Sequence, residues 1–140
     1  MQPANILVAD DDAVARDLLV EALKKEGYAV EAFASGEEII ARGRRGQVDL
    51  VLTDIRMGAV DGLTVLREFK RMSPDTAVVV LTSFGSLEGA IQAIKQGAYD
   101  YLAKPFKKED ITLVVKRSLD HCRLVRENAR IREELKTKDE

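Results

Sequence analysis

Several features that would mark common functional classes are scarce in this sequence of 140 residues. Cys122 is the only cysteine, so the chain can form neither an internal disulfide nor a cysteine-rich metal site. The longest apolar run, Ala77 to Leu81, is far too short to span a bilayer. The net charge of −2 gives no general attraction to nucleic acid or to anionic membranes. We therefore expect no membrane partner and no direct nucleic-acid binding by this segment.

Two further absences concern the start of the chain and histidine. The opening residues, MQPAN, lack the basic and apolar regions of a secretory signal peptide, which indicates a cytoplasmic protein. His121 is the only histidine and lies in a charged helical pattern. We expect it to be solvated, and the chain shows no evident phosphohistidine module.

Short apolar segments alternate with helical patterns along the chain. The segments predicted as strands are Asn5–Ala9, Ala29–Ala32, Asp49–Thr53, Ala77–Thr82 and Asp100–Ala103. The predicted helices are Asp12–Glu26, Ser35 to about Arg42, about Leu63 to Met72, Ser86–Gln96, and a long one from about Lys108 toward the end. Strands separated by single helices require a parallel sheet with right-handed crossovers. The predicted fold is therefore α/β, a doubly wound five-stranded parallel sheet with an extended C-terminal helix.

Local cap signals support three of these helix starts. Ser35 is followed three residues later by Glu38, which is the spacing of a capping box. Asp61 and Gly62 fit a turn and helix start better than a site. Asp12 could be a metal ligand or the N-cap of the first helix, and its position favours the cap.

Polar residues follow the predicted strands where those strands end. Asp10 and Asp11 follow the first strand, and Asp54 ends the third. Thr82 ends the fourth strand and Lys104 follows the fifth. Ligands of doubly wound sheets bind outside the carboxyl ends of the strands. If the strand order is 2-1-3-4-5, the three aspartates converge at the switch point, with Thr82 and Lys104 beside them.

Three carboxylates packed together repel, so either their pKa values rise or a cation neutralises them. A hard divalent ion such as Mg²⁺, which takes one or two carboxylates and keeps several waters, suits this site. The backbone carbonyl of Arg56, just after Asp54, could supply a further ligand. Lys104 would pair with an anion beside the metal, and Thr82 would offer it a hydroxyl. Since a carboxylate can act as a nucleophile, the set predicts a phosphoryl group on one of its own carboxylates.

The motifs "DD" after the first strand, "DIRM" and "VDG" around Asp54, "LTS" and "KPF" together resemble the receiver domain of two-component response regulators. The resemblance covers about residues 4 to 120 and implies a flavodoxin-like fold. It implies that Asp54 is the phosphoacceptor. It also implies that Asp11 is a direct Mg²⁺ ligand and that Asp10 acts on the metal largely through water.

The same resemblance assigns roles further along the chain. Thr82 would be the switch hydroxyl and Lys104 the phosphate partner. Tyr101 matches an aromatic whose ring reorients on activation, although its position alone would also fit plain core. The family often has a cis peptide before the proline of "KPF", here Pro105. It usually has proline where this chain has Gly58, which loosens the loop and leaves the geometry of the metal-binding carbonyl open.

Three functions compete for this site. The first is a signalling switch that a histidine kinase phosphorylates on Asp54, and that is no enzyme beyond self-phosphotransfer and slow autodephosphorylation. The second is a Mg²⁺-dependent aspartyl-phosphate phosphatase. Phosphatases of the haloacid dehalogenase type carry an Asp-x-Asp motif, in which the second acid protonates the leaving group. Here Arg56 stands at that position and cannot do this work at neutral pH. The third is a receiver that binds partners without phosphorylation, against which the intact acid set argues.

Residues 121–140 read as a helical linker that follows a receiver domain of residues 1–120. The segment RLVRENARIREEL is similar to the one that joins the receiver to the AAA+ ATPase in NtrC-type regulators, which act with sigma-54 RNA polymerase. This similarity implies a transcriptional output region beyond this chain. Leu124, Asn128, Ile131 and Leu135 have heptad spacing, which predicts a parallel coiled coil and a homodimer. A solvent-exposed single helix is the alternative, since fewer than two full heptads are visible.

Overall fold

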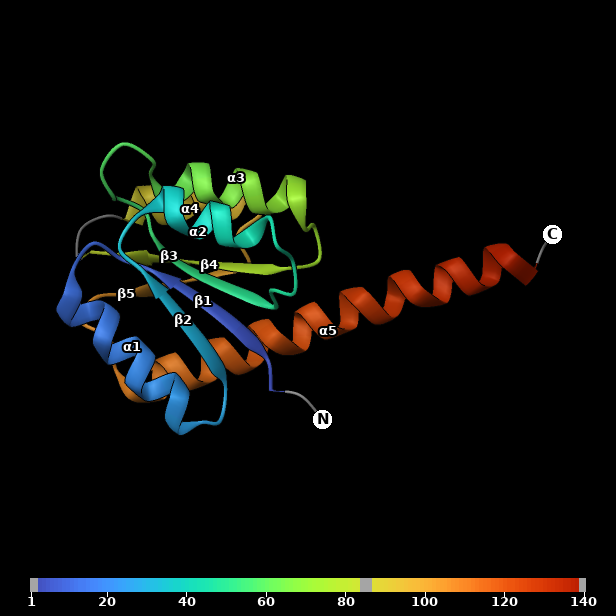
Figure 1. Ribbon diagram of the computed structural model, residues 1–140, viewed down its shortest axis with the longest axis horizontal. Helices are drawn as coiled ribbons and strands as arrows, with labels where there is room; N and C mark the ends of the chain where they lie inside the picture. Colours follow the sequence, from blue (N-terminus) through green and yellow to red (C-terminus); the bar gives the residue numbers. More distant parts are fainter. Residues whose placement is uncertain (1–2, 84–86, 139–140) are drawn as a thin grey trace.

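The structure is a computed structural model that describes residues 3–83 and 87–138. The strands are β1 Asn5–Ala9, β2 Ala29–Phe33, β3 Leu50–Asp54, β4 Ala77–Thr82 and β5 Asp100–Ala103. The helices are α1 Ala13–Lys25, α2 Gly36–Gly43, α3 Gly62–Met72, α4 Leu87–Lys95 and α5 Lys108–Lys138. All strand pairs are parallel, and the order is β2-β1-β3-β4-β5 (Figure 1). The predicted fold class and strand order are confirmed.

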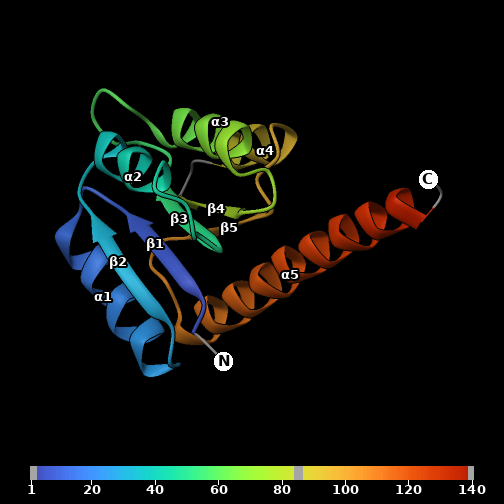
Figure 2. The same cartoon turned by 45° about the vertical axis from the view of Figure 1, so that its right-hand side comes forward.

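Helices cover both faces of the sheet (Figures 1 and 2). Alternate residues of β4 show how the core divides, because successive side chains of a strand point to opposite faces. Val79 and Leu81 join a cluster with residues of α1 and α5, and Val78 and Val80 join a second cluster with residues of α2, α3 and α4. Burial on both faces explains why β4 is a continuous apolar run rather than an alternating one.

The predicted caps are confirmed at three helix starts. Asp12 Oδ1 accepts a hydrogen bond from the backbone N–H of Val14 at 3.0 Å, so this side chain caps α1. Ser35 Oγ accepts from the N–H of Glu38 at 3.3 Å, and Asp61 Oδ1 accepts from the N–H of Thr64 at 2.9 Å. These contacts are local, which is why the sequence could predict them.

Element boundaries differ from the predictions by one or two residues at several ends. β2 continues to Phe33, which pairs with Ala9. β3 includes Asp54, which pairs with Leu81 of β4, so the candidate nucleophile is part of the sheet ladder rather than of the loop. The predicted start of the fourth helix at Ser86 lies outside the described residues.

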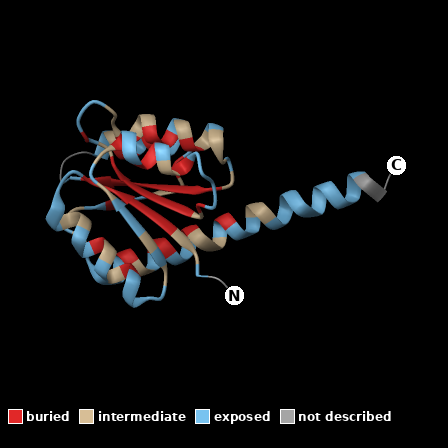
Figure 3. Cartoon of the chain, in the orientation of Figure 1, coloured by how far each residue is buried: buried red, intermediate tan, exposed pale blue. Residues whose placement is uncertain are grey.

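The C-terminal helix α5 is continuous and extends well beyond the sheet (Figure 3). It crosses residues 120 and 121 without a break, and Cys122 is buried against the core as a small packing residue. The division into a receiver domain and a linker stays a prediction. His121 is exposed as expected, but its ring also stacks on Tyr99 with centroids 4.6 Å apart, so it is not merely solvated. Among the described residues, no helix combines the length and apolarity needed to cross a bilayer.

Candidate functional site

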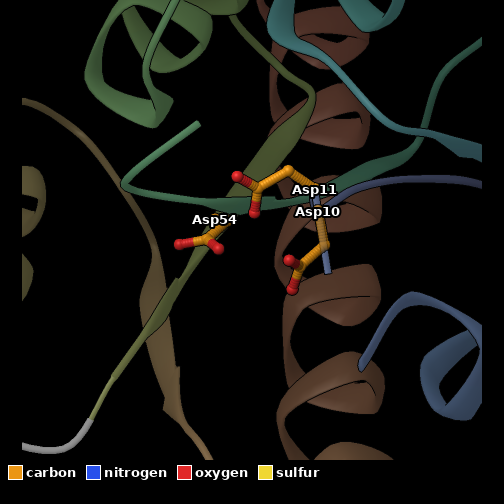
Figure 4. Close-up of side chains that lie close together, drawn as sticks. All are labelled: Asp10, Asp11 and Asp54. Carbon is orange, nitrogen blue, oxygen red and sulfur yellow. The ribbon is translucent and has the colours of Figure 1, made fainter. Parts of the chain in front are cut away.

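The sheet brings three aspartates together at the carboxyl ends of two neighbouring strands. Ala9 of β1 pairs with Thr53 of β3, so the residues that follow each of them lie side by side. One carboxylate oxygen from each of Asp10, Asp11 and Asp54 lies within 4.8 Å of the others (Figure 4). The predicted convergence of these residues is therefore present in the structure.

The three carboxylates have different environments. Asp10 is fully buried and Asp54 is 7% exposed, whereas Asp11 lies at the surface. Asp10 Oδ1 accepts a hydrogen bond from the N–H of Asp12 at 2.9 Å. Burial is the largest cause that raises the pKa of the Asp10 carboxyl, and the nearby charge of Asp54 raises it further. The pocket thus holds a deep acid, an acid at the strand end and an acid open to solvent.

Lys104, which follows β5, points its ammonium group into this cluster. Its Nζ lies 2.9 Å from Asp10 Oδ2 and 3.1 Å from Asp54 Oδ2. Burial lowers the pKa of Lys104, but its contacts with the two carboxylates more than offset that effect and leave the pKa raised. Lys104 is therefore held as a cation beside both acids. The peptide bond between Lys104 and Pro105 is cis, as the resemblance implied.

The donor set fits a hard divalent cation. Three carboxylates face one ammonium group, which leaves excess negative charge in a pocket that is partly shielded from water. Asp10 Oδ2 is buried and accepts no well-aligned hydrogen bond from the residues that the structure describes, although Lys104 Nζ lies close by. Oxygen ligands of this kind suit Mg²⁺, and the exposed carboxylate of Asp11 gives an ion access from solvent.

The loop after Asp54 takes a path that the usual proline could not follow. Gly58 has a φ of 44°, whereas proline is fixed near −65°. The backbone N–H of Arg56 donates to Asp54 Oδ1 at 3.1 Å, which places Arg56 next to the carboxylate. That its carbonyl binds the metal stays a prediction.

Thr82 and Tyr101 lie on the neighbouring strands β4 and β5. Thr82 ends β4, is 4% exposed, and pairs with Ala103, the last residue of β5. Its carbonyl accepts a hydrogen bond from the N–H of Lys104 at 2.7 Å. A backbone hydrogen bond therefore links Thr82 and Lys104, the two residues predicted to bind an anion. Tyr101 is 39% exposed, which contradicts a plain core role. Its role as a switch aromatic stays a prediction.

Sequence reasoning missed two supports of this site. The side chain of Arg16 donates to the carbonyl of Asp10 at 2.8 Å. Gly62, interpreted only as a helix start, also packs against β3: a Cβ at this position would lie 2.3 Å from the carbonyl oxygen of Asp54. Only glycine lets α3 begin this close to the backbone of Asp54. A glycine in the first turn after a candidate nucleophile was the available signal.

Comparisons with known proteins agree with this geometry. The sequence matches the response regulator receiver domain over residues 6–116. It is 36% identical over 123 residues to the DNA-binding transcriptional regulator NtrC of Proteus hauseri, covering 88% of this chain and 26% of that protein. It is 38% identical over 119 residues to the transcriptional regulatory protein ZraR of Salmonella typhimurium, covering 85% and 27%. The chain thus spans about a quarter of the length of these curated relatives.

Solved structures give the same result. The receiver domain of NtrX from Brucella abortus is 36% identical, with a TM-score of 0.79 over 82% of this chain and 98% of that one. NtrX from the same organism in complex with ADP has a TM-score of 0.87 at 35% identity, over 91% of this chain and 30% of that one. The chain belongs to the response regulator receiver domain family, and its similarities place it with the receivers of NtrC-type regulators.

Proposed function

We propose that this chain is a phosphoacceptor switch, in which Asp54 takes a phosphoryl group from the phosphohistidine of a sensor kinase. The observation that carries the proposal is the placement of the Asp54 carboxylate between two further acids and the ammonium group of Lys104. In the transfer, a bond forms between Asp54 Oδ and phosphorus while the bond between phosphorus and the histidine nitrogen breaks. Phosphoryl transfer depends mainly on positioning and charge neutralisation, which this pocket provides.

Each residue of the site has a task in this proposal. Asp11 and Asp54, with the Arg56 carbonyl and with Asp10 through water, would hold Mg²⁺, which supplies charge neutralisation for the incoming phosphoryl group. Lys104, kept protonated by its two acidic neighbours, pairs with a phosphoryl oxygen. The Thr82 hydroxyl donates to the same group.

The phosphatase alternative lacks its second acid. The residue two positions after Asp54 is Arg56, whose guanidinium stays protonated and cannot act as a general acid at neutral pH. A pocket that accepts a phosphoryl group but has no such acid holds the acyl phosphate and hydrolyses it slowly. We therefore propose no turnover activity beyond self-phosphotransfer and slow autodephosphorylation.

The surface next to the site supports a kinase as partner. Val14, in the first turn of α1, is 77% exposed, and Leu18, one turn later, is 45% exposed. Leu18, together with Phe106 and Ile111, lines part of a groove of about 210 Å³ between α1 and α5. Exposed apolar side chains beside a nucleophile favour the transient docking of a helical partner.

The relatives support a transcriptional output for the switch. NtrC is a DNA-binding transcriptional regulator that is about four times as long as the matched segment. By analogy, this receiver acts in the cytoplasm and passes its state through α5 to AAA+ and DNA-binding regions of a longer protein. It also forms a homodimer, which is supported by the exposure of Leu124, Ile131 and Leu135 on the C-terminal half of α5.

Intact mass measurement after incubation with acetyl phosphate tests this proposal. We expect one phosphoryl adduct with Mg²⁺, none after chelation, and none for Asp54→Asn, whereas the capping variant Asp61→Asn keeps the adduct. Steady turnover of a phosphomonoester would favour the phosphatase. Absence of any adduct on the wild-type chain in Mg²⁺ would favour a receiver that acts without phosphorylation.

A further inference from the structure

Arg126 is the last residue of α5 that packs on the domain. Cys122, one turn earlier on the same face, is buried in the core. Arg126 is partly buried, and residues 127 to 136 are all exposed (Figure 3). The exposed part of α5 therefore begins directly after Arg126.

The guanidinium of Arg126 makes three contacts with the end of the sheet opposite the acid cluster. Its Nε donates to Asp75 Oδ2 at 2.6 Å, and its Nη1 donates to Asp49 Oδ1. Its Nη2 donates to the carbonyl of Val48 at 2.8 Å. We call this set, Arg126 with Val48, Asp49 and Asp75, the Arg126 clamp. A planar guanidinium presents its donors in a fixed fork, so three simultaneous bonds fix its orientation.

The acceptors of the clamp are themselves fixed by other parts of the fold. Asp49 Oδ2 accepts from the backbone N–H of Asn5, the first residue of β1, at 2.7 Å. The carbonyl of Val48 also accepts from the Thr76 hydroxyl at 2.8 Å. The clamp thus joins α5 to the segments that lead into β1, β3 and β4, and the helix cannot pivot without breaking contacts to several of them.

We propose that the Arg126 clamp sets the direction in which α5 leaves the receiver, so that the extended part of the helix moves as one rigid body with the sheet. One turn past Arg126, Arg130 pairs with Glu127 and Glu134 of the same helix and does not add to the clamp. Asp49 directly precedes β3, whose last residue is Asp54. Any segment that follows α5 is therefore held at a set orientation to the strand that carries the candidate nucleophile.

The opposing view is that these contacts are an ordinary partly exposed ion-pair cluster, which would affect stability slightly and orientation not at all. Residual dipolar couplings of backbone amides, measured on the weakly aligned 140-residue chain, separate the two views. Couplings report the orientation of the helix relative to the sheet and do not depend on phosphorylation. Failure of this proposal would therefore leave the proposed function untouched.

The test compares Arg126→Met with the control Arg130→Met, which removes the same charge one turn later. We expect the couplings of residues 127–136 and of the sheet to fit one alignment tensor in the wild type and in Arg130→Met. In Arg126→Met, the tail couplings should shrink and require a separate tensor. One shared tensor in Arg126→Met, or two tensors already in the wild type, would overturn the proposal. If Arg126→Met does not fold, Asp75→Asn should also make the tail couplings fit the alignment tensor of the sheet less well. An unchanged fit in Asp75→Asn would also overturn the proposal.

Discussion

At the scale of single residues, the site depends on an imbalance of charge that the fold itself maintains. Asp10 is fully buried and its pKa is raised, yet among the described residues its ion-pair partner is Lys104, which Asp54 shares. Such a pocket favours whichever added cation relieves the repulsion. Substitution of Asp11, the predicted Mg²⁺ ligand, should therefore differ in its effect from substitution of Asp12, which caps α1.

Asp11→Ala should weaken Mg²⁺ binding more than Asp12→Ala does. An ion bound only to the folded state adds about 2.7 kcal/mol at a hundredfold excess over its Kd, and Asp11→Ala should lose most of this gain. Asp12→Ala should itself cost about 1 kcal/mol because it removes the cap of α1. The informative quantity is thus the difference in melting temperature with and without Mg²⁺. Equal differences in the two variants would reassign the ligand.

Thr82→Ala should permit phosphorylation of Asp54 but reduce the response to it. The phosphoryl group shifts the population between two states only as far as it binds one of them better, and the Thr82 hydroxyl supplies part of that preference. Amide chemical shifts on α4, β5 and the start of α5, compared before and after phosphorylation, measure the response. Ser83→Ala, which alters the exposed neighbour, is the control. A full shift in Thr82→Ala would remove this hydroxyl from the mechanism.

At the scale of elements, β3 connects two polar clusters at its opposite ends. Asp54 ends the strand within the acid cluster, and Asp49, which precedes it, belongs to the Arg126 clamp. The first cluster was predictable, because the carboxyl ends of parallel strands meet at one edge of a sheet. The clamp was not, since Arg126 is 51 and 77 residues away from its two acidic partners and no local pattern marks such a pairing. The contact of Gly62 with Asp54 was missed for a different reason, because this glycine was interpreted only as part of a helix start.

Arg126→Met should lower the free energy of unfolding by about 1–2 kcal/mol at neutral pH, a modest value because the pairs are partly exposed. Burial raises the pKa of Asp75, but Arg126 outweighs it and leaves that pKa below its ordinary value of 3.8. A depressed pKa contributes stability above the unfolded-state pKa, and this stability is lost as the pH falls through the folded-state pKa. The gap between wild type and variant in urea unfolding should therefore narrow below pH 3.8. A gap that is independent of pH would contradict this account.

At the scale of the whole molecule, the acid cluster lies at the carboxyl ends of the strands, and α5 leaves the domain at the opposite end of the sheet. The alternation of strands and helices predicted this architecture, because the periodicity of apolar residues along the entire chain reveals each element in turn. Association between two such molecules is not visible in a single chain. The sequence predicts it only through the short heptad stripe, and the structure adds that three apolar members of that stripe are exposed.

The 140-residue chain should be a dimer at tens of micromolar, and Ile131→Glu should weaken the dimer at least about tenfold, equivalent to about 1.4 kcal/mol. A buried charge on the stripe opposes pairing, whereas Ala129→Glu places the same charge off the stripe and serves as the control. Both substitutions leave Cys122 and Arg126 in place, unlike a truncation at residue 120. Sedimentation velocity measures the mass. A wild-type chain that is already monomeric would make the tail a linker only.

The central claim, that Asp54 is the phosphoacceptor, is tested most directly by locating the acyl phosphate. Borohydride reduces an aspartyl phosphate to homoserine, which tandem mass spectrometry assigns to a position in the chain. After incubation with acetyl phosphate and Mg²⁺, we predict homoserine at position 54 alone and none in Asp54→Asn. Homoserine at Asp10 or Asp11, or undiminished labelling of the Asn variant, would contradict the account.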